Sequence, residues 1–403
     1  DTPYFKKKNK FEKISWKESY SKIFDKISKT PSEKIAGITG DMTNMESLFA
    51  IKEFFEKTIK SKNLDSRSEN FYVNSKNRSN YIFNSKITGI EEADLIILIG
   101  TNPRYEATIL NSRIRKAYLN NNTDIFSIGN VGDLTYPYTE FENSTKIINE
   151  IVNDEHKLSD LIKQSQKPII VLGQSLLKMK SAPYVFEELK KYLLVNKKIS
   201  NQWNALNILS NNASTVGAYD LGILSSNNGN NNTLEKIKNN EFDIIFLFGQ
   251  DNLKFKKKNE YIIYLGSHGD RGAEMADIIL PSAAYTEQDG YFTNLEGRMQ
   301  KAYNASYPPG EAKEDWQIIN ELAASIKRKN LYTNKEELIN VMKNYLNLNK
   351  DKIFEVPNYE FINEKIYVDD LDYYHSNSIA RASKTMSDCK DISLNLKKTG
   401  TDG

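Results

Sequence analysis

Cysteine is almost missing from the 403-residue chain, in which Cys389 is the only one. A single thiol cannot form a disulfide within the chain. Cysteine-ligated iron–sulfur clusters need about four thiolates, and structural zinc sites commonly use roughly two to four, so the sequence by itself excludes both. The three histidines, His156, His268 and His375, are too few and too scattered for a metal site. We therefore expect no metal site in this chain.

Long apolar runs and an excess of one charge are lacking too. The longest apolar runs, Leu95–Ile99 and Ile244–Phe248, are far shorter than the roughly twenty residues of a membrane-spanning helix, so we expect buried strands and no membrane span. Lys and Arg number 55 and Asp and Glu 53, a net charge of +2. This balance excludes a dedicated nucleic-acid binder. The first residue is Asp1, and no targeting segment is visible, which indicates a processed form or one part of a longer polypeptide.

What the sequence does contain is a recurring unit, a short apolar strand that ends in glycine and a polar residue. It occurs at Asp94–Asn102, Pro168–Gln174 and Asp243–Gln250. Continuous branched apolar residues indicate strands buried on both faces, as in parallel sheets. Weaker strands are expected at 34–38, 124–128, 261–265 and 277–280, and amphipathic helices at 16–29, 45–60, 105–118, 182–194 and 203–216.

Strands and helices in alternation predict βαβ crossovers, and hence an α/β protein with two doubly wound units. We place the first α/β unit at residues 1–150 and the second at 151–302. Residues 303–346 are expected to form C-terminal helices, and residues 347–403 an extended tail that lies on other surfaces.

Strand-end glycines favour anions through backbone amides, so a nucleotide-binding α/β protein stays open as one interpretation. None of the three units, however, contains Gly-x-Gly-x-x-Gly or a P-loop. His268 and Asp270 could form an acid–base pair, although the surrounding glycines and Arg271 favour a structured loop. From the residues alone, the chain has no obvious catalytic residue.

Several sequence motifs, which follow one another over roughly residues 15–390, are similar to those of a known family. They are Glu91–Ala107, Asn111–Lys116, Val131–Tyr136, Ala276–Glu287, Asn294–Arg298, Pro308–Gly310, Glu314–Trp316 and Ser378–Ser383. Together they resemble the C-terminal part of the 75-kDa subunit family of respiratory complex I, the NADH:ubiquinone oxidoreductase. The resemblance implies a molybdopterin-oxidoreductase fold, like that of formate dehydrogenases and DMSO reductase, which in this family has lost its molybdenum cofactor.

The resemblance also implies what this chain does not carry. The family's N-terminal iron–sulfur region is missing, so its clusters are expected on a separate polypeptide or on the rest of a longer chain, with no cofactor in this one. Asn102, Glu287, Asn294 and Arg298 correspond to positions that touch the pterin in catalytic relatives, and we interpret them as a retained scaffold. The loop 63–89, where those relatives have a metal ligand, contains no cysteine. Its candidate serines are Ser66, Ser68, Ser75, Ser79 and Ser85.

The implied function is a structural, accessory part of the NADH-dehydrogenase module that supports electron transfer to ubiquinone without a catalytic residue of its own. Expected partners are other peripheral-arm subunits, including the flavin-module subunits and a cluster-bearing N-terminal polypeptide. The expected location is the matrix side of the mitochondrial inner membrane. The alternative is a catalytic molybdenum or tungsten pterin oxidoreductase with a serine ligand, such as a formate dehydrogenase relative.

Overall fold

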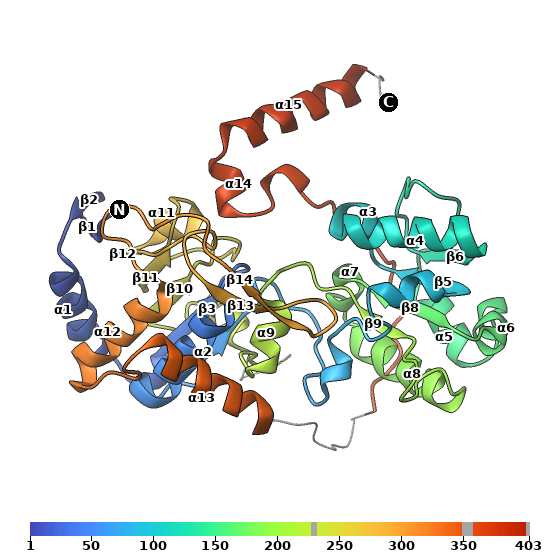
Figure 1. Cartoon of the computed structure of the whole chain (residues 1–403), viewed down its shortest axis with the longest axis horizontal. Coiled ribbons are helices and arrows are strands. Elements are labelled where there is room, and N and C mark those ends of the chain that lie inside the picture. The colour runs from blue at the N-terminus through green and yellow to red at the C-terminus, as the bar shows by residue number, and fades with distance from the viewer. Residues whose placement is uncertain (227–231, 349–357, 400–403) are drawn as a thin grey trace.

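The computed structural model describes residues 1–226, 232–348 and 358–399. Two β-sheets form two lobes that lie side by side, and a C-terminal tail passes over both (Figure 1). Lobe A is built around residues 4–65 and 244–281, whose sheet has the strand order β2-β1-β12-β11-β10-β3-β4. Lobe B is built around residues 95–208, whose sheet has the order β7-β6-β5-β8-β9.

Lobe A has a parallel core with an antiparallel hairpin at one edge. Its strands are β1 (Tyr4–Lys7), β2 (Lys10–Lys13), β3 (Ile35–Thr39), β4 (Leu64–Asp65), β10 (Ile244–Phe248), β11 (Tyr261–Gly266) and β12 (Ile278–Pro281). β4, β3, β10, β11 and β12 run parallel, while β1 pairs antiparallel with β12 and β2. β3 and β10 are buried at every position. This explains why their sequences do not alternate between apolar and polar residues.

Helices cover both faces of the sheet in lobe A. One face packs against α1 (Trp16–Ile27), α2 (Met45–Glu53), which continues as a π-helical segment (Phe54–Ile59), α12 (Asp315–Lys327) and α13 (Lys335–Leu348). The other face packs against α10 (Thr233–Lys238) and α11 (Arg271–Met275). Phe54, Phe55 and Phe246 meet edge to face with ring centroids 5.9–6.1 Å apart, a favourable geometry for aromatic pairs. The helix α9 (Thr215–Asp220) and the hairpin β13 (Gly290–Thr293) and β14 (Met299–Ala302) pack beside α2.

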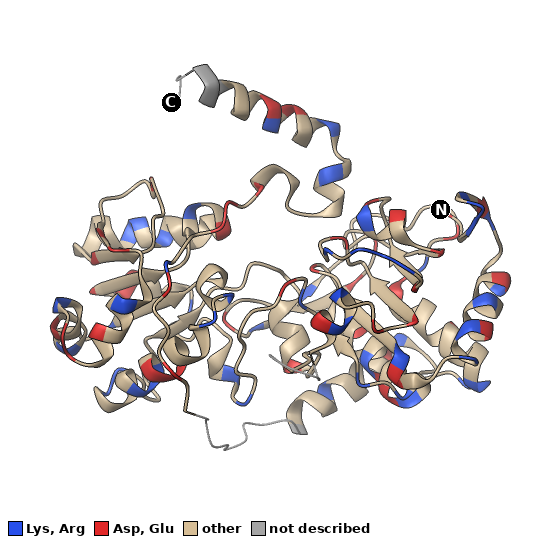
Figure 2. Cartoon of the chain, turned by 180° about the vertical axis from the view of Figure 1, so that it is seen from behind, with Lys and Arg blue, Asp and Glu red and all other residues tan. Residues whose placement is uncertain are grey.

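Lobe B is wholly parallel. Its strands are β5 (Leu95–Ile99), β6 (Asp124–Ile128), β7 (Thr139–Phe141), β8 (Pro168–Leu172) and β9 (Leu206–Ile208). One face carries α5 (Thr145–Val152), α6 (Lys157–Gln164), α7 (Gln174–Leu177) and α8 (Ala182–Val195). The opposite face carries α4 (Thr108–Asn121), which follows the short α3 (Pro103–Glu106). Basic and acidic residues are interspersed over both lobes (Figure 2), in keeping with the balanced net charge.

The structure confirms two parallel-stranded α/β sheets but corrects their division along the chain. The sheets do not follow the expected ranges 1–150 and 151–302, because β3 pairs with β10 at Ile35↔Ile244. Lobe B is therefore inserted between the two parts of lobe A. The helix expected at 203–216 is also wrong, since this segment contains β9. There the buried amide of Asn207 bonds to the Ser85 hydroxyl (3.0 Å), a contact that a local pattern cannot reveal.

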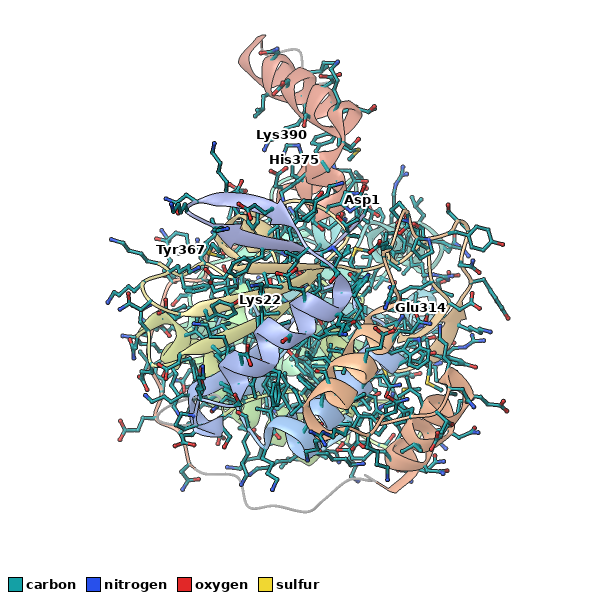
Figure 3. All side chains as sticks on the ribbon, turned by 90° about the vertical axis from the view of Figure 1, so that its left-hand side faces the viewer. Asp1, Lys22, Glu314, Tyr367, His375 and Lys390 are labelled. Carbon is teal, nitrogen blue, oxygen red and sulfur yellow. The ribbon has the colours of Figure 1, made fainter. Side chains whose placement is uncertain are left out.

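The tail is only partly extended. Residues 358–372 run along lobe B, where Ile366 is 0% exposed, and then lead into a short 3-10 turn (Tyr373–His375), α14 (Ser378–Ala382) and α15 (Lys384–Thr399). The expectation of an extended tail is therefore wrong for its last part. Figure 3 shows α15 standing clear of the body, with His375 and Lys390 near its base.

Candidate functional site

The carboxyl ends of four parallel strands of lobe A meet at one edge, where open α/β sheets bind ligands. β3 leads into Gly40 and Asp41, and β10 leads into Gly249, Gln250 and Asp251. The two glycines cross so closely that a Cβ atom on Gly40 would lie 2.0 Å from the carbonyl oxygen of Gly249. Only glycine permits this approach. These strand-end glycines therefore have a packing role.

An acidic cleft lies at this edge, with an empty volume of about 600 Å³ that includes space open to solvent. Asp41, Asp251 and Asp315 line it. Asp251 is 4% exposed and accepts hydrogen bonds from the Tyr264 hydroxyl (2.9 Å) and the Gly272 N–H (3.0 Å). These bonds fix its carboxylate in the wall of the cleft.

Burial raises the pKa of all three aspartates. The pKa of Asp41 and that of Asp315 both rise to about 6, and the pKa of Asp251 is raised as well. A hydrogen bond from the Asn252 amide opposes the rise at Asp41, and the Arg381 guanidinium opposes it at both Asp41 and Asp251. Because burial disfavours the charged form of a carboxyl group, ionised aspartates in this cleft depend on a cation close by.

Arg381, on α14, supplies that cation. Its Nε donates to the carboxylate of Asp270 at 2.6 Å, and its Nη1 donates to the carbonyl oxygen of His375 at 3.1 Å. The side chains of Arg381 and Asp270 are only 19% and 15% exposed. The tail thus forms one wall of the cleft. Its other lining residues are Asn377, Ser378 and Ile379.

Lobe B has a matching glycine crossing where β5 and β8 end. A Cβ atom on Gly173 would lie 2.2 Å from the carbonyl oxygen of Gly100. Beside this crossing, Glu106 accepts hydrogen bonds from the Thr101 hydroxyl (3.0 Å) and the Asn102 N–H (2.6 Å). Burial raises the pKa of Glu106 to about 7, although both hydrogen bonds act to lower it.

Each of the four pterin-site positions inferred from the sequence makes contacts within its own segment or with a nearby loop. Asn102 begins α3 in lobe B, where its Oδ1 accepts from the Arg104 N–H (3.0 Å) and its Nδ2 donates to the Val131 carbonyl (2.7 Å). The other three lie in loops of lobe A. There the Glu287 carboxylate accepts from the Ala284 N–H (2.9 Å).

Asn294 and Arg298 are brought together by the turn between β13 and β14. The Arg298 N–H donates to Asn294 Oδ1 at 2.8 Å, and the Asn294 N–H donates to the Arg298 carbonyl at 2.9 Å. Each of the four positions therefore has a local structural role. None of the four lines the acidic cleft in the described part of the chain.

Sequence reasoning does not single out the cleft residues. Asp41 and Asp251 each come just after a strand-end glycine, and that spacing is the signal that could have found them. Arg381 has no local signal, because its partner Asp270 lies 111 residues away along the chain. The sketched His268–Asp270 pair is replaced by this ion pair, while His268 Nδ1 lies 2.9 Å from the Ser267 hydroxyl.

A comparison with protein families shows the family of this chain. Residues 1–325 match the model of the family described as molybdopterin oxidoreductase, and the chain belongs to that family. A solved formyltransferase/hydrolase complex from Methylorubrum extorquens has the same fold in one of its chains. The TM-score is 0.57 and the identity 12%, over 81% of this chain and 99% of that chain.

The curated relatives are subunits of NADH-quinone or NADH-ubiquinone oxidoreductases. A subunit of the NADH-quinone oxidoreductase from Rickettsia bellii is 36% identical over 99% of this chain and 59% of that protein. The NADH-ubiquinone oxidoreductase 75 kDa subunit from Reclinomonas americana is 33% identical over 97% of this chain and 60% of that protein. These matches confirm the resemblance inferred from the motifs. The chain spans about three fifths of the length of these relatives.

The residues present do not fit the molybdopterin group that the family name implies. Among the candidate serine ligands, Ser66 donates to the Ile223 carbonyl (2.9 Å), Ser79 to Asn77 (2.6 Å) and Ser85 to the Asn204 carbonyl (2.7 Å). Within the described ranges, no three His, Cys, Asp or Glu side chains are grouped so that they could hold a metal ion by themselves. Buried carboxylates in the cleft of lobe A would also repel the phosphate of such a cofactor.

None of the helices in the described part of the chain combines the length and the apolar character that crossing a membrane requires.

Proposed function

We propose that the chain is a structural, accessory part of the NADH-dehydrogenase module of a respiratory NADH:quinone oxidoreductase. The observation that carries this proposal is the identity of 36% and 33% to subunits of two such enzymes over nearly the whole chain. The fold alone would not suffice, because a formyltransferase/hydrolase complex shares it, and one fold can serve unrelated functions.

In this proposal the chain binds no cofactor and supports electron transfer by holding other subunits in place. A sequence with one cysteine cannot ligate an iron–sulfur cluster alone, so the clusters belong on a separate polypeptide or on the remainder of a longer chain. The partners would be peripheral-arm subunits, among them the flavin-module subunits and a cluster-bearing N-terminal polypeptide. The location would be the matrix side of the mitochondrial inner membrane.

Native electrophoresis of gently solubilised membranes, followed by mass spectrometry of each band, tests the assembly. We expect the chain to migrate with the flavin-module and cluster-bearing subunits in one large band with NADH-dehydrogenase activity. A subunit of another respiratory complex in the same gel is the control for chance co-migration. Migration of the chain only as a free monomer, while the NADH-dehydrogenase band lacks it, would contradict the proposal.

Elemental analysis and EPR of the purified chain test the absence of a cofactor. We expect less than stoichiometric iron, molybdenum and tungsten, whether or not the metals are supplied during expression. A purified formate dehydrogenase measured in parallel shows that bound metal would be detected. Stoichiometric molybdenum or tungsten with formate turnover would support the catalytic alternative instead.

A further inference from the structure

The tail joins the two lobes through contacts at both of its ends. On lobe B, the Asp369 N–H donates to the Ser175 hydroxyl (2.9 Å), and the Asp369 carboxylate pairs with Lys178 (2.5 Å). Nearby, Glu364 accepts from the Ser181 N–H (2.7 Å). On lobe A, Arg381 pairs with Asp270. A segment of about a dozen residues therefore spans from lobe B to the acidic cleft of lobe A.

The lobe A end of this segment lies in the acidic cleft. Of the charged residues that line the cleft in the described chain, three are aspartates and one, Arg381, is a cation. Asp270 adds a fourth carboxylate next to the cleft, in direct contact with that guanidinium. The cation is thus supplied by the tail, and the anions by the loops that follow the strands of lobe A.

We propose that the acidic cleft of lobe A is a binding site for an arginine-bearing peptide segment, and that its ligand is the chain's own residues 377–381. The strand-end position at which related folds hold a ligand is here lined on one side by the tail. This proposal is independent of the proposed function, because it concerns contacts within the chain only.

Charge explains why the ligand is a cationic peptide. Buried carboxylates without a counter-ion are costly, and removing one partner of a buried ion pair leaves the other uncompensated. An anionic ligand such as a phosphate would add to the negative charge that Asp41, Asp251 and Asp315 already bring. A guanidinium reduces that charge, and its planar shape also lets it donate to Asp270 and to the His375 carbonyl at once.

Hydrogen–deuterium exchange on the full chain tests the seating of the tail. In Arg381→Gln, the amides of residues 377–382 and of the loop 266–272 should exchange about tenfold faster or more, because local opening becomes easier. Lys384→Gln is the matched control, since Lys384 is 90% exposed and lies three residues further along the tail. It should exchange like the unchanged chain. Unchanged exchange at 377–382 in Arg381→Gln would overturn the proposal.

A second variant and added ligands make the test specific. Asp270→Asn should release the same tail segment, and Arg381→Lys should restore only part of the protection, because lysine lacks the planar fork.

Added to Arg381→Gln, a synthetic peptide of residues 376–383 should protect loop 266–272 again, and the same peptide with Gln in place of Arg should not. Equal protection by inorganic phosphate would show an anion site and overturn the proposal.

Discussion

The two lobes end their central strands with the same glycine crossing but differ in the charge that surrounds it. In lobe A, three aspartates face a cleft that Arg381 of the tail enters. In lobe B, Glu106 is met by a hydroxyl group and a backbone N–H, and the tail is attached nearby by Lys178. Close backbone packing therefore sets the geometry of both crossings, whereas the charges beside each crossing differ between the lobes.

The largest effect should come from breaking the crossing itself. Gly40→Ala in lobe A and Gly173→Ala in lobe B each place a Cβ atom within about 2 Å of a backbone carbonyl. Because backbone atoms cannot rotate away, we expect each change to lower the free energy of unfolding by about 3–5 kcal/mol. Thermal and denaturant unfolding measure the loss.

Gly269→Ala is the control for these two changes, since a Cβ atom there meets nothing within 4 Å. It should leave stability within about 0.5 kcal/mol of the unchanged chain. If the losses in the free energy of unfolding of Gly40→Ala and Gly173→Ala differ by more than the experimental error, the two crossings are not equivalent. Close backbone packing would then not explain the stability of one of the two lobes.

The next effect concerns the attachment of the tail to lobe B. Ile366 is 0% exposed and packs in the main core of that lobe. Ile366→Ala should cost about 2–4 kcal/mol, seen as faster exchange of the amides around residue 366. Ile362→Ala is the matched control, because Ile362 is 42% exposed. Equal exchange in both variants would mean that Ile366 does not anchor the tail.

A smaller effect, of opposite sign, is expected at the buried carboxyl group of lobe B. The pKa of Glu106 rises from 4.5 to about 7 on folding. Between these values the unfolded chain is ionised and the folded chain is protonated, so this group's contribution to stability falls as the pH rises from about 4.5 to 7. Glu106→Gln removes this loss of stability, because glutamine does not ionise. Its side-chain oxygen can still accept the hydrogen bonds from the Thr101 hydroxyl and the Asn102 N–H. We expect it to stabilise the chain at pH 8 by roughly 1–3 kcal/mol.

Denaturant unfolding at several pH values checks this prediction. The difference between Glu106→Gln and the unchanged chain should be close to zero at pH 4.5 and constant above about pH 7.5. Glu188→Gln, at a partly exposed position of α8, is the control for the change of residue type itself. A Glu106→Gln difference that is independent of pH would show that burial does not govern the titration of Glu106.

The smallest effect should come from the ion pairs that hold the tail on lobe B. Lys178 pairs with Glu69 and Asp369, both at 2.5 Å, and its side chain is 30% exposed. Exposed pairs of this kind contribute at most about 1 kcal/mol and are screened by salt. Lys178→Ala should therefore loosen the tail slightly at low ionic strength and have no effect at 1 M salt. A loss that persists in high salt would indicate packing instead of charge.

Local sequence patterns predict most of the strands and helices. The run at Ile244–Phe248 is a strand with the expected bounds, and the amphipathic segment at 182–194 is a helix. Both depend on the neighbouring residues only, through continuous burial and helical spacing. The pairing of β3 with β10 is different, because it depends on which distant strand fits beside another. The boundary expected near residue 150 rests on the end of a helical segment, Lys146–Val152, before a polar linker, and a helix end does not indicate which strands pair.

The candidate site was harder to predict for the same reason. Asp41 and Asp251 come from two strands of one sheet, and Arg381 comes from a tail that returns to them after crossing lobe B. Motifs such as Asn294–Arg298 describe a local turn, and the structure gives them that role. The strand-end glycines mark Asp41 and Asp251, but no spacing in a single sequence shows that Arg381 lies beside them.

The insertion of lobe B has a consequence for synthesis on the ribosome. The strands of lobe B form one continuous stretch, so its sheet can pair as soon as β9 has left the exit tunnel. β3 is made earlier but receives its partner β10 only after the strands of lobe B have been made. Until then one edge of β3 is open to pairing with other chains. We infer that newborn chains are most prone to aggregate in this interval.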